Sequence, residues 1–537
     1  MNKMMYRPTM NRIFQLREWQ KEAFRAVLEK IEFGKREFLC VATPGAGKTK
    51  FALRVAHHFM KEGLCERIVV VTPSDNLKRQ WAKSAAEFSG LDIDPDFSNS
   101  QGIEAGDYHG IAITYALLGQ DKQEVHAQNS FNKRTLVILD EVHHAGDSLT
   151  WGKSVKNAFQ SAVFRLSISG TPFRSDDNEI PFIEYDETRT SMADYNYSYE
   201  RAIRDNVCRP VYFSINDGNM KWRVGESEFK HSFKDILTPD QVSKRLKTAL
   251  DVNGNYIRGV LRSADAKLTE IRRTHPEAGG LVFASTQKHA KELSQVIKQI
   301  TGTLPPVVVS DEGEGNKKID QFAHDSSRWL VSVKMVSEGV DIPRLRVGVY
   351  FTNIKAELFF RQAVGRFVRV LSHLQAQDAF VFIPMDRDIV KLAETIQEER
   401  DHALDKCEKG KGEGADQADL FGSEYVPALQ GRFQPLESQN TSENIISVNI
   451  EVTTGMKTGV LKKVTNQSPV FQQKKDLRDR LNTMARRIAI DIAKGTSDKP
   501  DFRYPHSAWI EQGGKPMESE TIPELEQRLE FYRSLMR

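Results

Sequence analysis

The sequence predicts an α/β protein with two parallel-sheet domains in series and a small, mainly helical C-terminal region. Short apolar runs alternate with amphipathic stretches over the first 200 residues, and the same alternation restarts near residue 280. Continuous apolar runs of this kind are typical of parallel strands that are covered on both faces. In addition, 537 residues are too many for one hydrophobic core. Two sheets in series are the simplest arrangement that satisfies both observations.

The apolar runs define where the strands of each sheet are expected. The first sheet is predicted from the runs 38–41, 68–71, 111–113, 136–139 and 166–168. The second sheet is predicted from the runs 281–283, 307–309, 329–333, 347–351 and 380–383. The segment between the two sheets is expected to be largely helical from Pro239 onward.

From about Glu398 the chain becomes charged, contains glycine and has few apolar residues, which indicates a linker. A short strand is expected at 445–452, and the last segment has helical periodicity and a high content of lysine and arginine. The domain boundaries predicted on this basis are 1–208, 209–400, 401–470 for the linker and irregular segment, and 471–537 for the basic helical region.

Composition excludes several classes of protein. The content of 39% hydrophobic and 28% charged residues is typical of a globular protein, and no apolar run reaches the roughly 20 residues of a membrane span. The four cysteines form no C-x-x-C pair, which argues against a disulfide framework or a zinc ribbon, so we expect a cytoplasmic location. Cys40 and Cys65 lie in or near apolar runs and are expected to be buried, inert thiols.

The segment 43–49, Thr-Pro-Gly-Ala-Gly-Lys-Thr, lies between the first apolar run and a helical pattern. Strand, glycine-rich loop and helix form the context of a phosphate-binding loop, in which backbone N–H groups and the helix N-terminus meet phosphate oxygens. Lys48 is expected to reach the β- and γ-phosphates, and the Thr49 hydroxyl to bind Mg²⁺. Ala42 stands where the strict pattern begins with glycine.

An acidic pair, Asp140 and Glu141, ends the apolar run at 136–139. The carboxyl ends of parallel strands are the ligand-binding edge of α/β sheets, so the pair should lie near the phosphate loop. We expect Asp140 to hold Mg²⁺ and Glu141 to polarise the attacking water. His144, three residues after Glu141, is expected to be packed or solvated rather than catalytic.

With these two sites in place, the chain resembles superfamily 2 DExH helicases and translocases over about residues 14 to 400. The resemblance is to the branch that contains restriction-enzyme motor subunits and XP-B-type repair helicases. The segments that resemble the family's motifs, in the family's order, are 14–20 (Q motif), 70–73 (Ia), 113–115 (Ib), 169–172 (III), 280–284 (IV), 336–341 (V) and 362–369 (VI). The departures are Val142-His143-His144 after the acidic pair and Gly170, where alanine is usual.

The resemblance implies two RecA-like domains, with ATP and Mg²⁺ as cofactors, and it assigns roles to particular residues. The residues implied to bind ATP are Arg17, Gln20, Thr43, Gly45, Ala46, Gly47, Lys48, Thr49, Gly339 and Asp341. The residues implied to be catalytic are Lys48, Glu141, Arg366 and Arg369, and those that hold the metal are Thr49 and Asp140. The coupling of ATP hydrolysis to domain movement is assigned to His143, Ser169, Thr171 and Gln362. Contact with the nucleic-acid backbone is assigned to Thr72 and Thr114.

The chemistry of Arg366 and Arg369 supports their role independently. A phosphoryl-transfer transition state spreads negative charge over its equatorial oxygens, and arginine supplies a rigid, permanently charged fork to meet that charge. The two residues are three apart, on one face of a predicted helix. The alternative is a pair of solvated helix arginines.

Two further features have alternative interpretations. Trp151 could stack on a base or pack its own loop down. The C-terminal helix could pack as an amphipathic element, contact phosphates, or do both, since apolar residues at helical spacing (Leu477, Leu481, Met484, Ile488) alternate with basic ones. Its basic residues are Lys474, Lys475, Arg478, Arg480, Arg486 and Arg487.

The sequence therefore predicts an ATP-dependent nucleic-acid translocase or helicase, most favourably one that acts on DNA in repair, restriction or defence. The alternatives are an ATP-switch clamp that does not unwind nucleic acid and works inside a larger complex, or an RNA helicase. The overall charge does not decide between them, because 76 basic and 73 acidic residues leave a net charge of only +3. Protein partners are expected to bind through the C-terminal region, and no membrane partner is expected.

Overall fold

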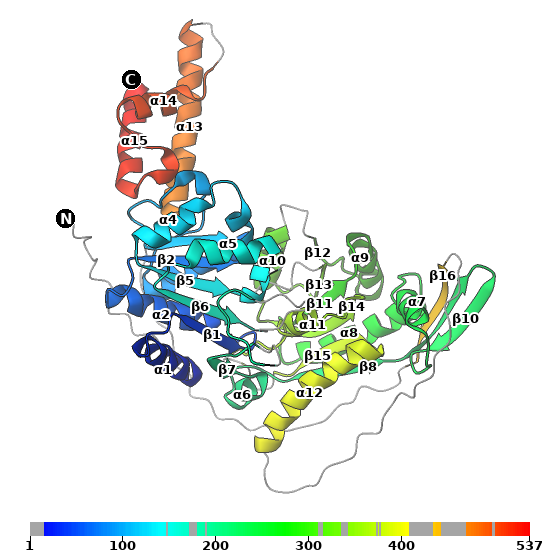
Figure 1. Ribbon diagram of the computed structural model, residues 1–537. Coiled ribbons are helices and arrows are strands. Elements are labelled where there is room, and N and C mark those ends of the chain that lie inside the picture. Colours follow the sequence, from blue (N-terminus) through cyan, green and yellow to red (C-terminus); the bar gives the residue numbers. More distant parts are fainter. Residues whose placement is uncertain are drawn as a thin grey trace. The chain divides into compact units, whose positions relative to one another are not determined.

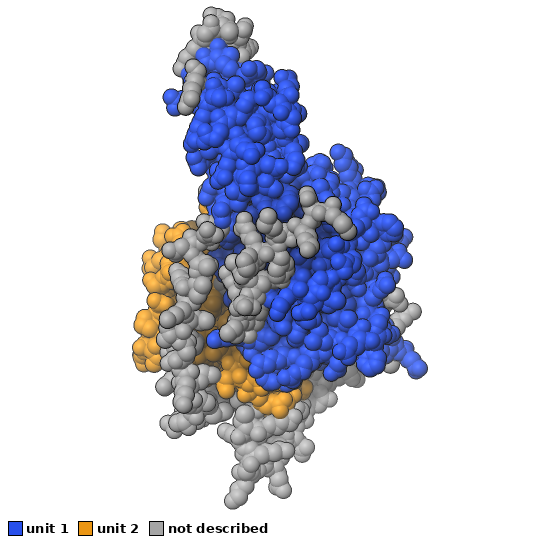
Figure 2. Space-filling model, turned by 90° about the vertical axis from the view of Figure 1, so that its left-hand side faces the viewer, with its two compact units in different colours: residues 1–42, 47–196, 461–537 blue, residues 43–46, 197–460 orange. Residues whose placement is uncertain are grey.

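The computed structural model describes residues 15–146, 149–170, 180–187, 191–309, 315–333, 342–371, 374, 377–407, 433–441, 469–496 and 500–536. The chain forms two compact units, shown in different colours in Figure 2. The first unit comprises Met1–Ala42, Gly47–Asn196 and Leu461–Arg537, and the second comprises Thr43–Ala46 and Tyr197–Val460. Each unit is built around an α/β sheet, which confirms the predicted fold class of two RecA-like domains with added C-terminal helices (Figure 1).

The first unit contains a seven-stranded sheet in the order β3-β4-β2-β5-β6-β1-β7. Its strands are β1 (Glu37–Ala42), β2 (Arg67–Thr72), β3 (Ile93–Asp94), β4 (Gly110–Thr114), β5 (Thr135–Asp140), β6 (Phe164–Ser169) and β7 (Tyr195–Tyr197). The pairs from β3 through to β1 are all parallel. Each apolar run predicted for this sheet falls inside one of these strands. The ends of β5, β6 and β1 are therefore neighbours at one edge of the sheet.

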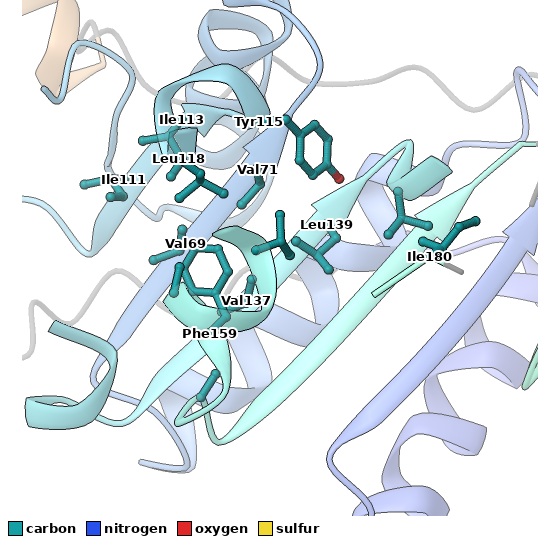
Figure 3. Packing of buried hydrophobic residues seen from close by; sticks show 14 of the residues in the cluster. Val69, Val71, Ile111, Ile113, Tyr115, Leu118, Val137, Leu139, Phe159 and Ile180 are labelled. Carbon is teal, nitrogen blue, oxygen red and sulfur yellow. The ribbon is translucent and has the colours of Figure 1, made fainter. Parts of the chain in front are cut away.

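Helices cover this sheet and create its core. They are α1 (Glu18–Glu32), α2 (Lys48–Lys61), α3 (Asp75–Ser84), α4 (Glu124–Asn132) and α5 (Leu149–Phe159), with short turns η1 (Ala85–Ser89), η2 (Asn99–Gln101), η3 (Tyr115–Gly119) and η4 (Val142–Gly146). In Figure 3, apolar side chains of β2, β4 and β5 gather with Phe159 of α5 and Leu118 of η3, and all of them are buried. This packing holds the three strands in register, so the segments that follow β2 and β4 are fixed relative to the end of β5.

The second unit contains a six-stranded sheet in the order β12-β13-β11-β14-β15-β8, with every neighbouring pair parallel. Its strands are β8 (Val211–Asn216), β11 (Gly279–Ala284), β12 (Val307–Val308), β13 (Trp329–Ser332), β14 (Leu345–Phe351) and β15 (Ala379–Pro384). Its helices are α6 (Tyr199–Arg204), α7 (Pro239–Ala249), α8 (Asn255–Arg272), α9 (Gln287–Thr301), α10 (Gly315–His324), α11 (Glu357–Val364) and α12 (Arg387–Cys407). Helices α7 and α8 agree with the helical segment expected after Pro239.

A separate three-stranded antiparallel sheet, which the sequence analysis did not predict, also belongs to the second unit. It has the order β10-β9-β16 and consists of β9 (Gly218–Val224), β10 (Ser227–Ser232) and β16 (Phe433–Asn440). Strand β16 lies in the stretch that we predicted to be linker and irregular segment, and it pairs with β9. The strand expected at 445–452 lies outside the described residues. The domain boundaries predicted from the sequence remain proposals.

The C-terminal helices are α13 (Val470–Thr496), α14 (Tyr504–Glu511) and α15 (Ile522–Leu535) (Figure 1). They have an apolar core of their own. Leu481 and Ile488 of α13 are buried against Leu525 and Leu529 of α15. This contact agrees with the expectation that α13 packs through the apolar face of an amphipathic helix. The side chain of Lys474 is fully buried and donates a 2.6 Å hydrogen bond to Asp107, so one of the basic residues of this helix serves to attach it to the sheet domain.

Two expectations from composition can be compared with the structure. Among the described residues, Cys40, Cys65 and Cys208 are buried free thiols, and burial raises the pKa of Cys40 and of Cys65 to about 12. The thiols of Cys40 and Cys65 are therefore protonated at neutral pH. In the described part of the chain, we find that no helix combines the length and the apolar character needed to cross a membrane.

Candidate ATP-binding and catalytic site

The phosphate loop connects β1, which ends at Ala42, with α2, which begins at Lys48. Gly45 has a φ of 84° and Gly47 a φ of 94°, values that favour glycine because a side chain would be strained there. Gly47 is also the N-cap of α2. The first N–H groups of a helix have no partner within the helix and lie at the positive end of its dipole. The loop that precedes α2 is thus suited to an anion, as the sequence predicts.

Gln20 fixes this loop from the neighbouring helix α1. Its side chain is buried, Oε1 accepts a 2.9 Å hydrogen bond from the backbone N–H of Arg17, and Nε2 donates one of 2.9 Å to the carbonyl of Gly47. The two residues at the start of the resemblance, Arg17 and Gln20, are therefore placed beside the phosphate loop. Binding of ATP by these two residues remains a prediction.

The side chains of Lys48 and Glu141 meet although 93 residues separate them in the sequence. Nζ of Lys48 lies 3.1 Å from Oε1 of Glu141 and donates a 3.3 Å hydrogen bond to the carbonyl of Ala42. The two side chains are 12% and 24% exposed, so the pair is accessible from solvent but largely shielded. The sheet order explains the contact, because β6 alone separates β5 from β1.

The second oxygen of Glu141 is held by the segment that follows β6. Oε2 accepts a 3.3 Å hydrogen bond from the Ser169 hydroxyl and a 3.2 Å hydrogen bond from the backbone N–H of Gly170. Nδ1 of the buried His143 forms a 3.0 Å hydrogen bond with the same hydroxyl. Because the proton of that hydroxyl goes to Glu141, Nδ1 of His143 is the donor. Three of the predicted site residues, His143, Ser169 and Glu141, are thus brought together.

Glu141 itself has a φ of 47°, an uncommon value for a residue with a side chain. Burial would raise the pKa of Glu141, but Lys48 and then His143 outweigh it and lower this pKa to about 2. The carboxylate is therefore ionised at neutral pH and can accept a proton or a hydrogen bond from water. A strained backbone at a single, heavily bonded residue is typical of a functional site.

Asp140 and Thr49 fit the requirements of a Mg²⁺ site. Mg²⁺ prefers oxygen ligands, and the two residues supply a carboxylate and a hydroxyl at the ends of β5 and of the phosphate loop. The carboxylate of Asp140 is buried, and its Oδ2 accepts a 2.7 Å hydrogen bond from Nε1 of Trp81. Burial, followed by the charge of Glu141, raises the pKa of Asp140, and a cation at this carboxylate would favour its ionised form.

The structure corrects one detail of motif VI. We expected Arg366 and Arg369 on one face of a helix, but α11 ends at Val364 and Gly365 is its C-cap. Arg366 lies in the following turn, and Arg369 forms an isolated bridge with Cys208. The helix does not continue because the backbone after Gly365 pairs with the segment 208–209, where the N–H of Arg209 donates a 2.8 Å hydrogen bond to the carbonyl of Val368. Gln362 lies in the last turn of α11.

The two residues expected to contact nucleic acid differ in accessibility. Thr72 is fully buried, and the single proton of its hydroxyl is shared between the carbonyls of Ser74 (3.0 Å) and Ile113 (3.4 Å). A contact of this segment with nucleic acid would therefore be made by neighbouring groups. The half-buried Thr114 accepts a 3.3 Å hydrogen bond from the N–H of Leu117 and caps η3.

Other predicted residues lie outside the part of the chain that can be described. Thr171, Gly339 and Asp341 are outside the described residues, and so is the motif V segment 336–341. Trp151 lies in α5, but its side chain is likewise not described, so the choice between stacking and packing stays open.

The structure adds two residues that the sequence analysis did not assign to the site. Trp81 and Tyr115 each form a hydrogen bond with Asp140, one with its side chain and one with its backbone. Trp81 lies on α3 directly after the segment that resembles motif Ia, and Tyr115 is the last residue of the segment that resembles motif Ib. Their sequence positions next to two motifs were the available signal, but nothing in the sequence indicated that they contact Asp140.

Comparison with known families agrees with this arrangement. Residues 13–174 match the family described as "Type III restriction enzyme, res subunit", and residues 264–371 match the "Helicase conserved C-terminal domain". The first match contains the phosphate loop, the acidic pair and Ser169, and the second contains Arg366 and Arg369.

Individual proteins are also similar in sequence to this chain. The chain is 42% identical over 395 residues to the uncharacterized protein Rv2917 of Mycobacterium tuberculosis, covering 72% of this chain and 64% of that protein. It is 25% identical over 388 residues to DNA 3'-5' translocase XPB2 of Sulfurisphaera tokodaii, covering 66% of this chain and 79% of that protein. The chain thus spans a little under two thirds of the length of Rv2917.

Among solved structures, a fragment of a putative HsdR subunit of a type I restriction enzyme from Vibrio vulnificus YJ016 superposes with a TM-score of 0.51 at 16% identity. The superposition covers 72% of this chain and 67% of that fragment. At this level of identity, the likeness concerns the fold.

Proposed function

We propose that this chain, which belongs to the superfamily 2 helicases and contains the res-subunit and helicase C-terminal domains, hydrolyses ATP and uses the energy to move along DNA. The observation that carries the proposal is the arrangement around Glu141. Its ionised carboxylate is held by Lys48 on one oxygen and by Ser169 and Gly170 on the other. A phosphate-binding lysine and a carboxylate that can orient water are the groups that ATP hydrolysis needs.

In this mechanism, each residue has a separate role. Lys48 and the N–H groups at the start of α2 bind the phosphates, and Gln20 keeps the loop in place. Mg²⁺ held by Asp140 and Thr49 would neutralise charge that develops on the phosphates. Glu141 orients the attacking water and accepts its proton. Ser169 and His143 connect Glu141 to the end of β6, so a movement of that segment would change the position of the carboxylate.

Arg366 and Arg369 are proposed to stabilise the charge of the transition state. Gly339 and Asp341 are proposed to contact the nucleotide. Gln362 and Thr171 are proposed to couple ATP hydrolysis to domain movement. These assignments rest on the resemblance and on the permanent charge of the guanidinium group. DNA is proposed as the track because the named function of one relative is DNA 3'-5' translocase and another relative, at 22% identity, is a subunit of the type I restriction enzyme EcoKI of Escherichia coli.

The test is ATP hydrolysis by the full chain, measured without nucleic acid and with matched DNA and RNA duplexes. Lys48→Ala should abolish hydrolysis because it removes the phosphate-binding ammonium group. Glu141→Gln should bind ATP but turn it over at least about 100-fold more slowly, since a carboxamide is a poor proton acceptor. Lys61→Ala, at the exposed end of the same helix, is the matched control and should behave as wild type.

The outcomes separate the possible functions. Normal hydrolysis by Glu141→Gln would contradict the assignment of the base. Stimulation by RNA but not by DNA would favour an RNA helicase. Stimulation by DNA without movement along it or displacement of a strand would favour a clamp that works within a larger complex.

A further inference from the structure

Asp140 accepts hydrogen bonds from two aromatic residues that lie in different segments of the first unit. Trp81 lies on α3, which begins after the short turn that follows β2, and is 1% exposed. Its Nε1–H donates a 2.7 Å hydrogen bond to Oδ2 of Asp140. Asp140 is 6% exposed, so the bond is formed away from bulk water. A buried carboxylate depends on its few donors, because water cannot replace them.

Tyr115 reaches Asp140 from the end of β4, which lies on the opposite side of β2 from β5 in the sheet. It is the first residue of η3, directly after β4, and its side chain is 0% exposed. Its hydroxyl donates a 3.0 Å hydrogen bond to the backbone carbonyl of Asp140. The two aromatic residues therefore hold both the side chain and the main chain of one residue.

The segments that carry Trp81 and Tyr115 are also connected to each other. The buried hydroxyl of Thr72, at the end of β2, shares its one proton between the carbonyl of Ser74 just before α3 and the carbonyl of Ile113 in β4. Strands β2 and β4 are paired in register up to Thr72 and Thr114. Strand pairing and hydrogen bonds thus connect the two segments to each other and to Asp140.

We propose that Trp81 and Tyr115 are positioning residues that make the Mg²⁺ affinity of Asp140 depend on whether nucleic acid is bound at the segments after β2 and β4. The inference rests on the proposed function, in which Asp140 holds Mg²⁺, and on the resemblance, which assigns contact with the nucleic-acid backbone to Thr72 and Thr114 in these two segments. Residues that bond a metal-binding carboxylate determine its orientation, and removing them typically lowers metal affinity or activity by about 10- to 100-fold. Here those residues lie on the elements that would meet the track.

The experiment uses Trp81→Phe and Tyr115→Phe in the full chain. Each change removes one donor and keeps an aromatic ring, and Tyr115→Phe removes only a hydroxyl group. Binding of a fluorescent, non-hydrolysable ATP analogue is titrated at several Mg²⁺ concentrations and in EDTA, with and without saturating duplex DNA. The factor by which DNA tightens Mg²⁺-dependent binding is the coupling between the two sites.

We expect Trp81→Phe to weaken Mg²⁺-dependent binding about tenfold, to leave binding in EDTA unchanged, and to reduce the coupling factor. Tyr115→Phe should reduce the coupling factor with a smaller effect on Mg²⁺, because it bonds the backbone rather than the carboxylate. Trp222→Phe is the matched control. Trp222 is fully buried in the antiparallel sheet, and its Nε1 has no hydrogen-bond partner among the described residues. It should behave as wild type.

Three results would overturn the inference. One is a folded Trp81→Phe protein with wild-type Mg²⁺ dependence and wild-type coupling. Another is equal weakening in Mg²⁺ and in EDTA, which would indicate a structural role alone. The third is a wild-type protein that does not bind the analogue with Mg²⁺ or does not respond to DNA, and this result would remove the proposed function as well.

Discussion

At the scale of single residues, the chemistry of the site depends on how Glu141 is held. A carboxylate that accepts bonds from Lys48, Ser169 and Gly170 has few orientations available to it. Its lowered pKa, about 2, keeps it ionised over the whole neutral range. The positive φ of Glu141, 47°, is uncommon for a residue with a side chain and persists only where the surrounding structure holds it. The residue is thus preorganised before any reaction takes place.

Replacing Arg366 or Arg369 with alanine should leave ATP binding largely intact and slow hydrolysis at least about tenfold. An arginine at the transferring phosphoryl group contributes roughly 10³–10⁵ in rate in other enzymes, so tenfold is a cautious expectation. Arg361→Ala is the matched control, because Arg361 lies on α11 and is paired with Glu357 and Glu399. Steady-state ATPase rates measure the effect, and an unchanged rate for Arg366→Ala would refute its proposed role.

The sequence could predict these charged residues but not their surroundings. Lys48, Glu141 and Ser169 lie at or just after the ends of apolar strands, and parallel strands align their ends, so the meeting of these residues was predictable from pattern and order. The bond from Trp81 to Asp140 was not, because it depends on how a helix turn faces a neighbouring strand. The break of the helix before Arg366 was also missed, since the pattern from Gln362 to Arg369 alone is compatible with a helix.

At the scale of elements, the attachment of α13 depends on Asp107. Oδ1 of Asp107 accepts a hydrogen bond from Lys474, and Oδ2 accepts one of 3.0 Å from the backbone N–H of Ile522 at the start of α15. The ammonium group of Lys474 also lies 4.2 Å from the centroid of the Tyr108 ring. Val470 packs on Ala105 and Tyr108. One loop of the sheet domain thus holds two of the C-terminal helices.

Lys474→Met should destabilise the protein by roughly 1.5–3 kcal/mol, the usual contribution of a hydrogen bond to a charged group. Methionine keeps the length of the side chain and leaves Asp107 without its cation. Unfolding in urea measures the loss, and Asp107→Asn combined with Lys474→Met completes a double-mutant cycle. Lys475→Met, at the exposed neighbouring position, is the control and should have little effect. Additive losses in the cycle would mean that the two side chains do not interact.

The antiparallel sheet contains one strand that has a recognisable sequence pattern and one that does not. In β9, Met220, Trp222 and Val224 are buried and alternate with more accessible residues, a period of two that marks a strand. Strand β16 contains a proline and several polar residues, and it forms only through pairing with β9, about 200 residues earlier in the chain. Such long-range pairing leaves no local signal, which is why the stretch was predicted to be linker.

At the scale of the whole molecule, the region after residue 400 is divided between both units. Strand β16 completes a sheet of the second unit, whereas α13, α14 and α15 belong to the first. A truncation near Asp401 would therefore remove packed parts of both units rather than a separate tail. Loss of activity in such a truncated protein would not distinguish nucleic-acid binding from stability, so the role of α13 is better tested by changing its exposed charges.

Among the basic residues of α13 whose side chains are described, four remain exposed after the helix has packed, namely Lys475, Arg480, Arg486 and Arg487. If they contact phosphates, neutralising all four to glutamine should weaken binding to duplex DNA and reduce the slope of log affinity against log salt concentration. Each phosphate contact contributes roughly 0.9 to that slope, so the reduction should be about 3 to 4 if all of them engage. Because these side chains lie outside the buried core of the C-terminal helices, the melting temperature should not change.

Asp476 and Asp479 provide the matched control, since they are exposed on the same helix and carry the opposite charge. Neutralising them to asparagine should strengthen binding slightly or leave it unchanged, because it removes repulsion from phosphates. Titrations of each variant against duplex DNA at several salt concentrations measure the slopes. An equal slope for the glutamine variant and wild type would mean that α13 serves only for packing or for binding a protein partner, and the nucleic-acid contacts would then have to come from the segments after β2 and β4.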